Sequence, residues 1–446
     1  MSRILIKNGT VFDGKNVRKA DIYIKDGKID AVASKIKRSG VQVIDASGKV
    51  VLPGFICAHH HLYSTMARGM GIPGTPAKNF QEVLDRLWWP LDRALDKEDL
   101  YLSALYALGE CIRWGTTTII DHHESQNFQK GSLDTLMKAC EKAGIRAALT
   151  LGSSDRYGKG MEGVEENERF LKKLKKEKHP LIQCMVGLHA AFTANDKTLK
   201  ASADLAKKYN CGLHIHVAEA KSDEDASVKK HRMRVVERLN KLGALGKKTI
   251  LVHCVHTNDK EAALIKKTDS IVVHNSESNM NNAVGWSDVL TFLKKGVLTG
   301  LGSDGMSSNM LQQLRCAYLI ARHAKGDPRV GFMEAPTMLL QNNAQIASRI
   351  FGGSFGSIAK GKVADIAIMD YFPPTPLNSG NFLGHLIFGL VNCQVDTTIA
   401  SGRILMKNKK ILAFDEKKLS EAISKRAPEF WKRFNKEATT KKSWKV

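Results

Sequence analysis

Long apolar runs are absent from this sequence. No stretch approaches the roughly 18–20 apolar residues that a membrane-spanning helix requires. The first residues, MSRILIKNGTVFDG, are interrupted by Asn8, Gly9 and Asp13 before they reach the apolar length of a signal peptide. The sequence therefore predicts a cytoplasmic protein without a membrane segment.

Closely spaced cysteine pairs are also absent. None of the eight cysteines has the CxxC spacing that is typical of zinc ribbons and redox sites. Single cysteines scattered along a long chain mostly behave as small buried apolar side chains. We expect this of Cys57, Cys111, Cys140, Cys184, Cys211, Cys254, Cys316 and Cys393.

Acidic residues are few relative to basic ones. The 446 residues include 68 Lys and Arg but only 45 Asp and Glu, which gives a net charge of +23. Residues 403–446 alone hold 14 basic and 5 acidic side chains. Clustered cations can bind nucleic acid, but no nucleic-acid motif accompanies them, and a solvated helix face explains them as well. A basic nucleic-acid- or ligand-binding protein without catalysis is kept as the alternative from a different class.

The two ends of the chain have β-rich patterns. Residues 1–53 alternate apolar and polar residues, with a turn expected at Asn8-Gly9, and Pro53-Gly54 closes the segment. The β pattern returns after residue 352, in GKVADIAIMD and TTIASGRILM. We predict that 1–53 and 353–446 form one small composite β-sandwich domain. A basic helix is expected at about 415–437, interrupted at Pro428.

The segment from residue 54 to residue 352 alternates strand and helix patterns. Residues 98–114 have apolar side chains at helical spacing, and Gly115 ends that helix before a β-branched run. Alternating strands and helices indicate a parallel sheet. We therefore predict an α/β fold in which 54–352 forms a (β/α)8 TIM barrel. Its strands are expected at 55–61, 117–123, 147–153, 182–189, 213–219, 250–254, 271–275 and 298–304.

Histidines are concentrated where these predicted strands end. In a (β/α)8 barrel the carboxyl ends of the strands line one mouth, and active sites lie there. Core packing would not concentrate histidines in this way. Ten of the 15 histidines fall at these ends: His59, His60, His61, His122, His123, His189, His214, His216, His253 and His274.

Four of the strand-end residues are candidate metal ligands. His59 and His61 are two residues apart, so on a strand they face the same side, whereas His60 points away. His216 supplies a third imidazole, and Asp304 follows the last strand in LGSDG. A turn Asp before Gly is the alternative for Asp304. His214 either lies behind the metal ligands or is simply packed.

The remaining candidates would act on water or substrate. Glu219 lies three residues after His216, where a carboxyl group can shuttle protons; an acid at a helix N-terminus is the alternative. His253, in LVHC, and His189, in GLHA, each end a strand. His122 and Arg68 are further candidates for substrate contact, and an exposed loop arginine is the equal alternative for Arg68.

These motifs occur together in a known order. PGFICAHHHL, GLHA, HIHVAE, LVHC, HNSESN and LGSDG resemble the amidohydrolase superfamily. More narrowly, they are similar to its branch of cytosine and guanine deaminases, S-adenosylhomocysteine deaminases and triazine chlorohydrolases. The stretches DYFPPTPLNSGNFLGHLIFGL and AHHHLYSTMARGM further resemble aminohydrolases of the SsnA type.

The resemblance implies one divalent metal per chain, zinc in preference to iron, and a homo-oligomer. The metal would be held by His59, His61, His216 and Asp304. Relatives with two metals carry a bridging Lys at the fourth strand, but here that strand ends in Val-Gly-Leu-His.

The resemblance also implies roles in catalysis. Glu219 would protonate a ring nitrogen, His253 and Asp304 would orient and deprotonate water, and His189 would contact substrate. The expected function is a deaminase that releases ammonia from an N-heterocycle such as a purine or pyrimidine. The alternative at the same site is loss of chloride or an alkylamine from a triazine-like ring.

Overall fold

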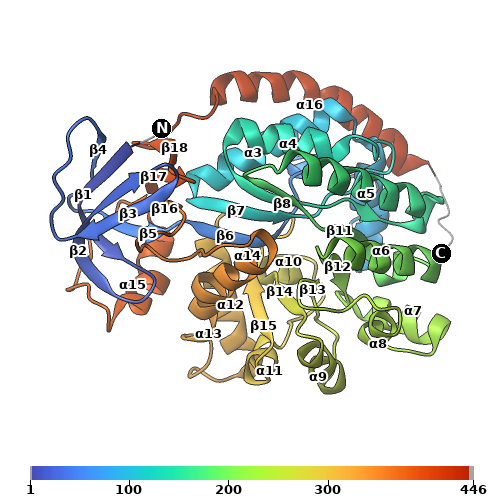
Figure 1. Ribbon diagram of the computed structural model, residues 1–446. Coiled ribbons are helices and arrows are strands. Elements are labelled where there is room, and N and C mark those ends of the chain that lie inside the picture. Colours follow the sequence, from blue (N-terminus) through green and yellow to red (C-terminus); the bar gives the residue numbers. More distant parts are fainter. Residues whose placement is uncertain (1–2, 441–446) are drawn as a thin grey trace.

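The computed structural model describes residues 3–440 and confirms an α/β fold with parallel-strand sheets (Figure 1). One mostly antiparallel sheet is formed by strands from both ends of the chain, and two parallel sheets are formed by strands from its middle. The outermost parts of the two predicted terminal segments, residues 1–2 and 441–446, lie outside the described residues.

The mixed sheet joins the N-terminal and C-terminal segments. Its order is β19-β18-β17-β16-β5-β1-β2-β3, with β4 added beside β1. The seam is the antiparallel pair of β16 and β5, where Ile366 lies opposite Pro53. Apolar side chains from the strands of this sheet, such as those of Ile4, Ile22 and Ile366, are buried together in one core. The strands are β1 (Arg3–Phe12), β2 (Val17–Lys25), β3 (Lys28–Ala33), β4 (Gln42–Asp45), β5 (Val50–Pro53), β16 (Ile366–Met369), β17 (Val395–Ala400), β18 (Arg403–Lys407) and β19 (Lys410–Ile411).

The turn expected at Asn8-Gly9 is wrong. Strand β1 runs through these residues, and the register of its pairing with β2 shifts between Ile6 and Gly9. Asn8 has a positive φ of 62°, and its backbone N–H donates to Asp21 Oδ1 at 2.9 Å. Asn tolerates this conformation, so the dipeptide makes a β-bulge inside a strand instead of a hairpin.

All eight strands predicted for the middle of the chain are present. They form two parallel sheets, ordered β10-β8-β7-β6 and β15-β14-β13-β12-β11-β9. The third predicted strand is divided into β8 and β9 and the fourth into β10 and β11, one part in each sheet. A parallel bridge joins His60, at the end of the edge strand β6, to Asp304, which follows the edge strand β15. The bounds are β6 (Phe55–His60), β7 (Thr116–Asp121), β8 (Arg146–Leu149), β9 (Gly152–Ser153), β10 (Ile182–Cys184), β11 (Val186–Ala190), β12 (Leu213–Val217), β13 (Ile250–His253), β14 (Ile271–His274) and β15 (Leu298–Leu301).

Helices alternate with these strands, and several of them begin at a residue whose side chain accepts hydrogen bonds from the first turn. Asp96 accepts from the backbone N–H groups of Glu98 and Asp99, and Asn258 accepts from that of Glu261. The helices include α2 (Trp89–Ala94), α3 (Lys97–Arg113), α4 (Ser132–Ala143), α5 (Gly160–Glu177), α6 (Asp196–Tyr209), α7 (Lys221–His231), α8 (Val235–Lys241), α9 (Asp259–Lys267), α10 (Ser276–Asn281), α11 (Val289–Lys294), α12 (Met310–Lys325), α14 (Asn343–Phe351) and α15 (Phe382–Phe388).

The last helix, α16 (Glu416–Thr439), is not interrupted at Pro428 as the sequence predicts. It runs along α3 and reaches α2 (Figure 1). Leu419, Phe430 and Phe434 are buried on its inner face, and Arg426 Nε donates to Asp99 Oδ1 at 2.8 Å. Contacts on both sides of Pro428 hold the helix together, so tertiary packing offsets the hydrogen bond that proline cannot donate.

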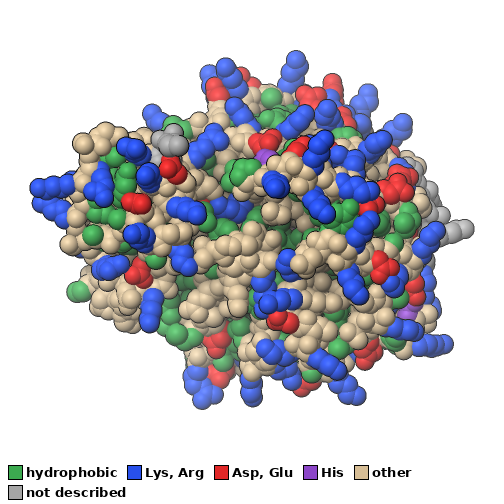
Figure 2. All heavy atoms as spheres, viewed as in Figure 1, with side chains coloured by type: hydrophobic (Ala, Val, Ile, Leu, Met, Phe, Trp, Pro, Cys, Tyr) green, Lys and Arg blue, Asp and Glu red, His purple; other side chains and the backbone are tan. Residues whose placement is uncertain are grey.

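Within residues 3–440, no helix is long and apolar enough to cross a membrane. Figure 2 shows Lys and Arg side chains spread over the whole visible face. The cations of α16 are partly engaged within the molecule, because Arg426 and Arg433 both pair with the buried Asp99 of α3.

Candidate metal centre

Four of the predicted residues converge into one buried cluster. His59 and His61 come from the end of β6, His216 from β12, and Asp304 follows β15. Their potential ligand atoms all lie within 4.8 Å of one another. Asp304 Oδ1 is 2.8 Å from His61 Nε2 and 3.5 Å from His59 Nε2, and the Nε2 atoms of His61 and His216 are 3.3 Å apart.

The donor set of this cluster fits a divalent metal ion. The buried Nε2 atom of His59 has no hydrogen-bond partner among the described residues. Buried polar atoms of this kind usually have partners, and three imidazole nitrogens with a carboxylate oxygen are ligands that zinc and other first-row divalent metals accept.

The opposite nitrogen of each imidazole is fixed from behind. His61 Nδ1–H donates to the carbonyl of His122, and His216 Nδ1–H donates to the carbonyl of His189 at 2.6 Å. His59 Nδ1 lies 2.8 Å from His214 Nε2. These contacts turn the Nε2 atoms toward the cluster, and they place His214 behind His59, one of the two alternatives that the sequence left open.

A second cluster shares Asp304 and adds Glu219 and His253. His253 Nε2 lies 3.5 Å from Glu219 Oε2 and 3.7 Å from Asp304 Oδ2. His253, Cys254 and Asp304 have positive φ angles of 70°, 50° and 55°. Such a backbone costs about 1–3 kcal/mol for a residue other than glycine and is concentrated at functional sites. The strand ends are thus bent so that these side chains meet.

The two carboxyl groups of this second cluster have opposite protonation tendencies. Burial, together with the charges of Asp304 and Asp223, raises the pKa of Glu219 well above its usual value. Burial also acts to raise the pKa of Asp304, but the neighbouring imidazoles of His59, His61 and His253 outweigh it and hold that pKa well below its usual value. Two neighbouring carboxyl groups whose pKa values are shifted in opposite directions are suited to act as a general acid and a general base.

Several polar residues at this site were not predicted from the sequence. Ser278 Oγ donates to Asp304 Oδ2 at 2.5 Å, and Asn279 Oδ1 lies 2.7 Å from His253 Nδ1. Asn282 Nδ2 donates to Glu219 Oε1, and Asp223 accepts from the backbone N–H of Glu219. Ser278 and Asn279 lie in the HNSESN motif, although no role was predicted for either residue. For Asn282 and Asp223 the signal in the sequence was their position, within about ten residues after predicted strands, where βα loops form the mouth.

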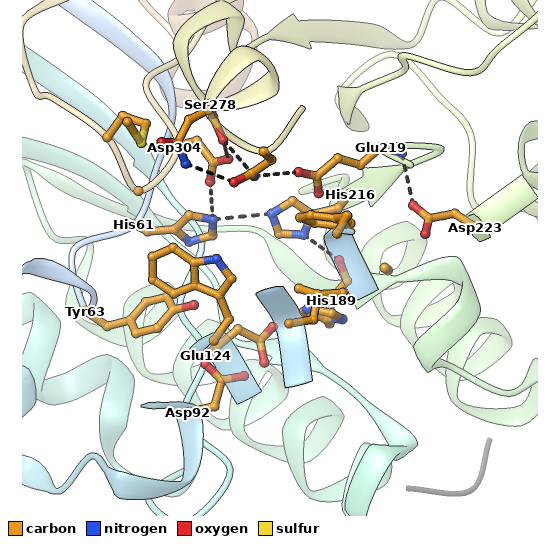
Figure 3. A pocket seen from close by; sticks show the side chains of 18 of the residues that line it. His61, Tyr63, Asp92, Glu124, His189, His216, Glu219, Asp223, Ser278 and Asp304 are labelled. Atoms are coloured by element: carbon orange, nitrogen blue, oxygen red, sulfur yellow. Dashed lines mark hydrogen bonds and ion pairs between the residues drawn. The ribbon is translucent and has the colours of Figure 1, made fainter. Parts of the chain in front are cut away.

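A pocket opens onto the two clusters (Figure 3). His61, His216, Glu219 and Asp304 contribute to its wall. Apolar side chains suited to a flat ring line the rest of it, and Figure 3 shows Asp92 and Glu124 across the pocket from Asp304 and Ser278. The apolar lining residues are Phe80, Leu84, Trp88, Ala190, Phe192 and Met306.

The three residues predicted to contact substrate lie at different places relative to the pocket. His189 lines the pocket. His122 is completely buried, its Nε2–H donates to the carbonyl of Leu188, and its ring lies behind His216 with 4.6 Å between ring centroids. Arg68 is not among the residues that line this pocket; its side chain is 55% exposed and pairs with Glu110. The structure thus favours the alternative of an exposed loop arginine.

Comparison with known protein families shows to which family the chain belongs. The model of the amidohydrolase family matches residues 50–405. The chain belongs to this family. It is therefore a hydrolase of the class that the sequence motifs predicted, acting on carbon–nitrogen bonds.

Individual relatives agree with this placement. A 5'-deoxyadenosine deaminase of Methanosarcina mazei is 31% identical over 98% of this chain and 100% of that protein. A zinc-bound adenosine deaminase from Xanthomonas campestris has the same fold, with a TM-score of 0.85 and 21% identity over 98% of this chain and 99% of that one. The zinc complex of atrazine chlorohydrolase TrzN from Arthrobacter aurescens gives a TM-score of 0.82 and 22% identity over 95% and 100%.

Proposed function

We propose that this amidohydrolase is a metal-dependent deaminase that hydrolyses an amidine-like carbon of an aminopurine or related N-heterocycle and releases ammonia. The observation that carries the proposal is the position of two carboxyl groups, Glu219 and Asp304, at one pocket beside the imidazoles of His59, His61 and His216. The relative from Methanosarcina mazei, named for deamination of an adenine nucleoside, supports a purine ring.

His59, His61, His216 and Asp304 would hold one divalent metal ion, and zinc is the ion we propose. Such an ion acts as a Lewis acid and makes a water molecule acidic enough to attack at neutral pH. Side chains of the protein would orient the water and move the protons.

The proposed reaction uses His253, Asp304 and Glu219. Asp304 and His253 orient the attacking water, and Asp304 accepts a proton from it. The water oxygen bonds to the ring carbon that carries the amine, and Glu219 gives its proton to the adjacent ring nitrogen. The proton held by Asp304 then passes to the amine, and the carbon–nitrogen bond breaks so that ammonia leaves. The added hydroxyl group gives its remaining proton back to Glu219 as the carbon becomes a carbonyl. His189 contacts the heterocycle from the pocket wall.

The architecture that we propose around this site is a closed (β/α)8 barrel at 54–352. Two features support closure: the chain continues from one parallel sheet into the other at β8–β9 and at β10–β11, and a bridge joins His60 to Asp304. Residues 1–53 and 353–446 would form a composite β-sandwich domain. We further propose a cytoplasmic homo-oligomer.

The raised pKa of Glu219 favours deamination over dechlorination. An amine must be protonated before it leaves, whereas chloride leaves without a proton. A carboxyl group whose pKa is raised holds its proton more tightly and is therefore suited to protonating an amine leaving group.

The experiment measures ammonia release by protein reconstituted with zinc or iron. The panel contains aminopurines and their nucleosides, aminopyrimidines, pterins and aminotriazines. We expect ammonia from a purine compound, and a loss of about 10²–10⁴-fold in rate in Glu219→Gln with the metal retained. Glu162→Gln, on the exposed side of α5, is the matched control. Chloride or alkylamine in place of ammonia, or full activity in Glu219→Gln, would contradict the proposal.

A further inference from the structure

The two carboxyl groups of the proposed reaction are joined by a chain of hydrogen bonds from the end of α10. Ser278 Oγ donates to Asp304 Oδ2 at 2.5 Å, and Asn282 Nδ2 donates to Glu219 Oε1 at 3.3 Å. Asn282 Nδ2 also lies 3.4 Å from Ser278 Oγ. Figure 3 shows Ser278, Asp304 and Glu219 on the same side of the pocket. One short segment thus contacts both the proposed base and the proposed acid.

The spacing of Ser278 and Asn282 in the sequence brings their side chains together. They are four residues apart, about one helical turn, and the backbone N–H of Asn282 donates to the carbonyl of Ser278 at 2.9 Å. The turn then closes at Ala283, which has a positive φ of 51°, and the N–H of Val284 donates to the carbonyl of Asn279 at 3.2 Å. A left-handed backbone is unfavourable for alanine, so tertiary contacts must hold this helix end.

The end of α10 is tied to the segment that carries Glu219. Val284 and Ala220, the residue after Glu219, belong to one buried apolar cluster. His256 joins the same two segments, because its backbone N–H donates to the carbonyl of Ala218 and its Nε2–H donates to the carbonyl of Val284 at 2.9 Å. The backbone on either side of the contact with the proposed acid is therefore fixed.

The side-chain amide of Asn282 is oriented so that it presents its donor to Glu219. Its Oδ1 accepts from Asn281 Nδ2 at 3.1 Å, which leaves its Nδ2 directed at the carboxyl group. In a protonated carboxyl group the carbonyl oxygen is the better acceptor, and the other oxygen carries the proton. Asn282 thus makes Oε1 the carbonyl oxygen of Glu219. The proton lies on Oε2, the atom that is 3.5 Å from His253 Nε2.

We propose that Asn282 is a positioning residue, which fixes the carboxyl group of Glu219 so that its proton is delivered from Oε2 to the ring nitrogen of the substrate. Ser278, within reach of the same amide, keeps this acid in a fixed relation to Asp304. An acid that already has the orientation required for proton transfer loses no further freedom in the transition state. This deepens the proposed function and rests on it for the role of Glu219.

Two substitutions of Asn282 separate positioning from packing. Asn282→Ala removes the donor, whereas Asn282→Asp keeps the size and shape of the side chain and replaces the donor with an acceptor, which would draw the proton of Glu219 to Oε1. In the zinc-loaded full chain, kcat for ammonia release is expected to fall about tenfold or more in both variants, with KM changed less than about threefold. Met280→Ala, on the exposed side of α10, is the matched control and should keep the wild-type kcat.

A second measurement does not depend on turnover. The urea midpoint of unfolding is measured for the zinc-loaded wild type, Asn282→Ala, Glu219→Ala and the double variant, which together form a double-mutant cycle. Asn282→Ala is expected to lower the midpoint in the wild-type background and to leave it unchanged in the Glu219→Ala background, where its partner is already absent.

A wild-type kcat in Asn282→Asp would overturn the inference, because a side chain that only fills space tolerates this substitution. So would a raised KM with an unchanged kcat, or an equal effect of Asn282→Ala on unfolding in both backgrounds. If Asn282→Ala does not fold, kcat of Asn282→Asp decides. An absence of ammonia release by the wild type would contradict the proposed function, and the cycle would still show whether Asn282 holds Glu219.

Discussion

Asn279 holds the imidazole of His253, with its Oδ1 atom 2.7 Å from His253 Nδ1. This contact makes Nδ1 the protonated nitrogen, so that Nε2 carries its lone pair toward Glu219 and Asp304. Both residues are buried. The orientation of His253, which we propose to orient the attacking water, thus depends on Asn279 of α10.

Replacing Asn279 with Ala is expected to lower kcat by about 10–100-fold with a smaller change in KM, because His253 would lose its fixed tautomer and orientation. The measurement is steady-state ammonia release with the metal content checked. Asn240→Ala, at an exposed position of α8, is the control. An unchanged kcat in Asn279→Ala would show that His253 needs no partner.

His214 is expected to act on the metal through His59. His214→Ala removes the partner of His59 Nδ1, which should weaken metal affinity by about 10–100-fold. Competition between the protein and a chelator measures this affinity, and His231→Ala, on the partly exposed end of α7, is the control. If His214→Ala binds the metal as tightly as the wild type, His214 is merely packed.

The strand ends made the cluster of three histidines and Asp304 predictable from the sequence. His59, His61, His216 and Asp304 were chosen because strands of a parallel sheet bring their carboxyl ends together, and the structure brings these four side chains within one ligand set. The identity of each residue and its place on a strand carried enough information, since a strand fixes the direction of alternate side chains.

Residues in loops and at special backbone positions were not predictable in this way. Asn279 and Asn282 depend on the paths of βα loops, which no periodicity describes. Asn8-Gly9 has the composition of a turn but forms a bulge, and Pro428 has the composition of a helix end but lies inside α16. In both cases tertiary contacts outweigh the local preference.

Asp223 is expected to make stability depend on pH. Burial raises the pKa of its carboxyl group from 3.8 to about 7, so the folded chain binds this proton more tightly than the unfolded chain. Between these two values the unfolded state carries fewer protons, and the free energy of unfolding falls as pH rises, by at most about 1.4 kcal/mol per pH unit from this group.

Asp223→Asn removes this titration and keeps an oxygen that can accept from the backbone N–H groups of Glu219 and Ala220. Denaturant unfolding of both proteins over this pH window should therefore give a shallower decline for the variant. A steeper decline in Asp223→Asn than in the wild type would contradict the assignment.

The C-terminal helix is expected to stabilise the fold through its buried aromatic side chains. Phe434→Ala should lower the free energy of unfolding by about 3–5 kcal/mol, since the fully buried ring leaves a cavity beneath α16. Thermal and denaturant unfolding measure the loss. Phe372, which is 83% exposed, supplies the control substitution to Ala, with an expected effect within about 0.5 kcal/mol. Equal losses in the two variants would exclude a stabilising role for this contact.

The central claim is that His59, His61 and His216, with Asp304, hold the metal ion that deamination requires. Removing the metal and restoring it tests this claim most directly. The chain is stripped with a chelator and titrated with zinc while bound metal and ammonia release from 5'-deoxyadenosine are followed together. We predict that activity rises in proportion to bound zinc and levels off at one ion per chain, and that His216→Ala neither retains the ion nor recovers activity. Ammonia release by the metal-free chain, or full recovery in His216→Ala, would contradict the account.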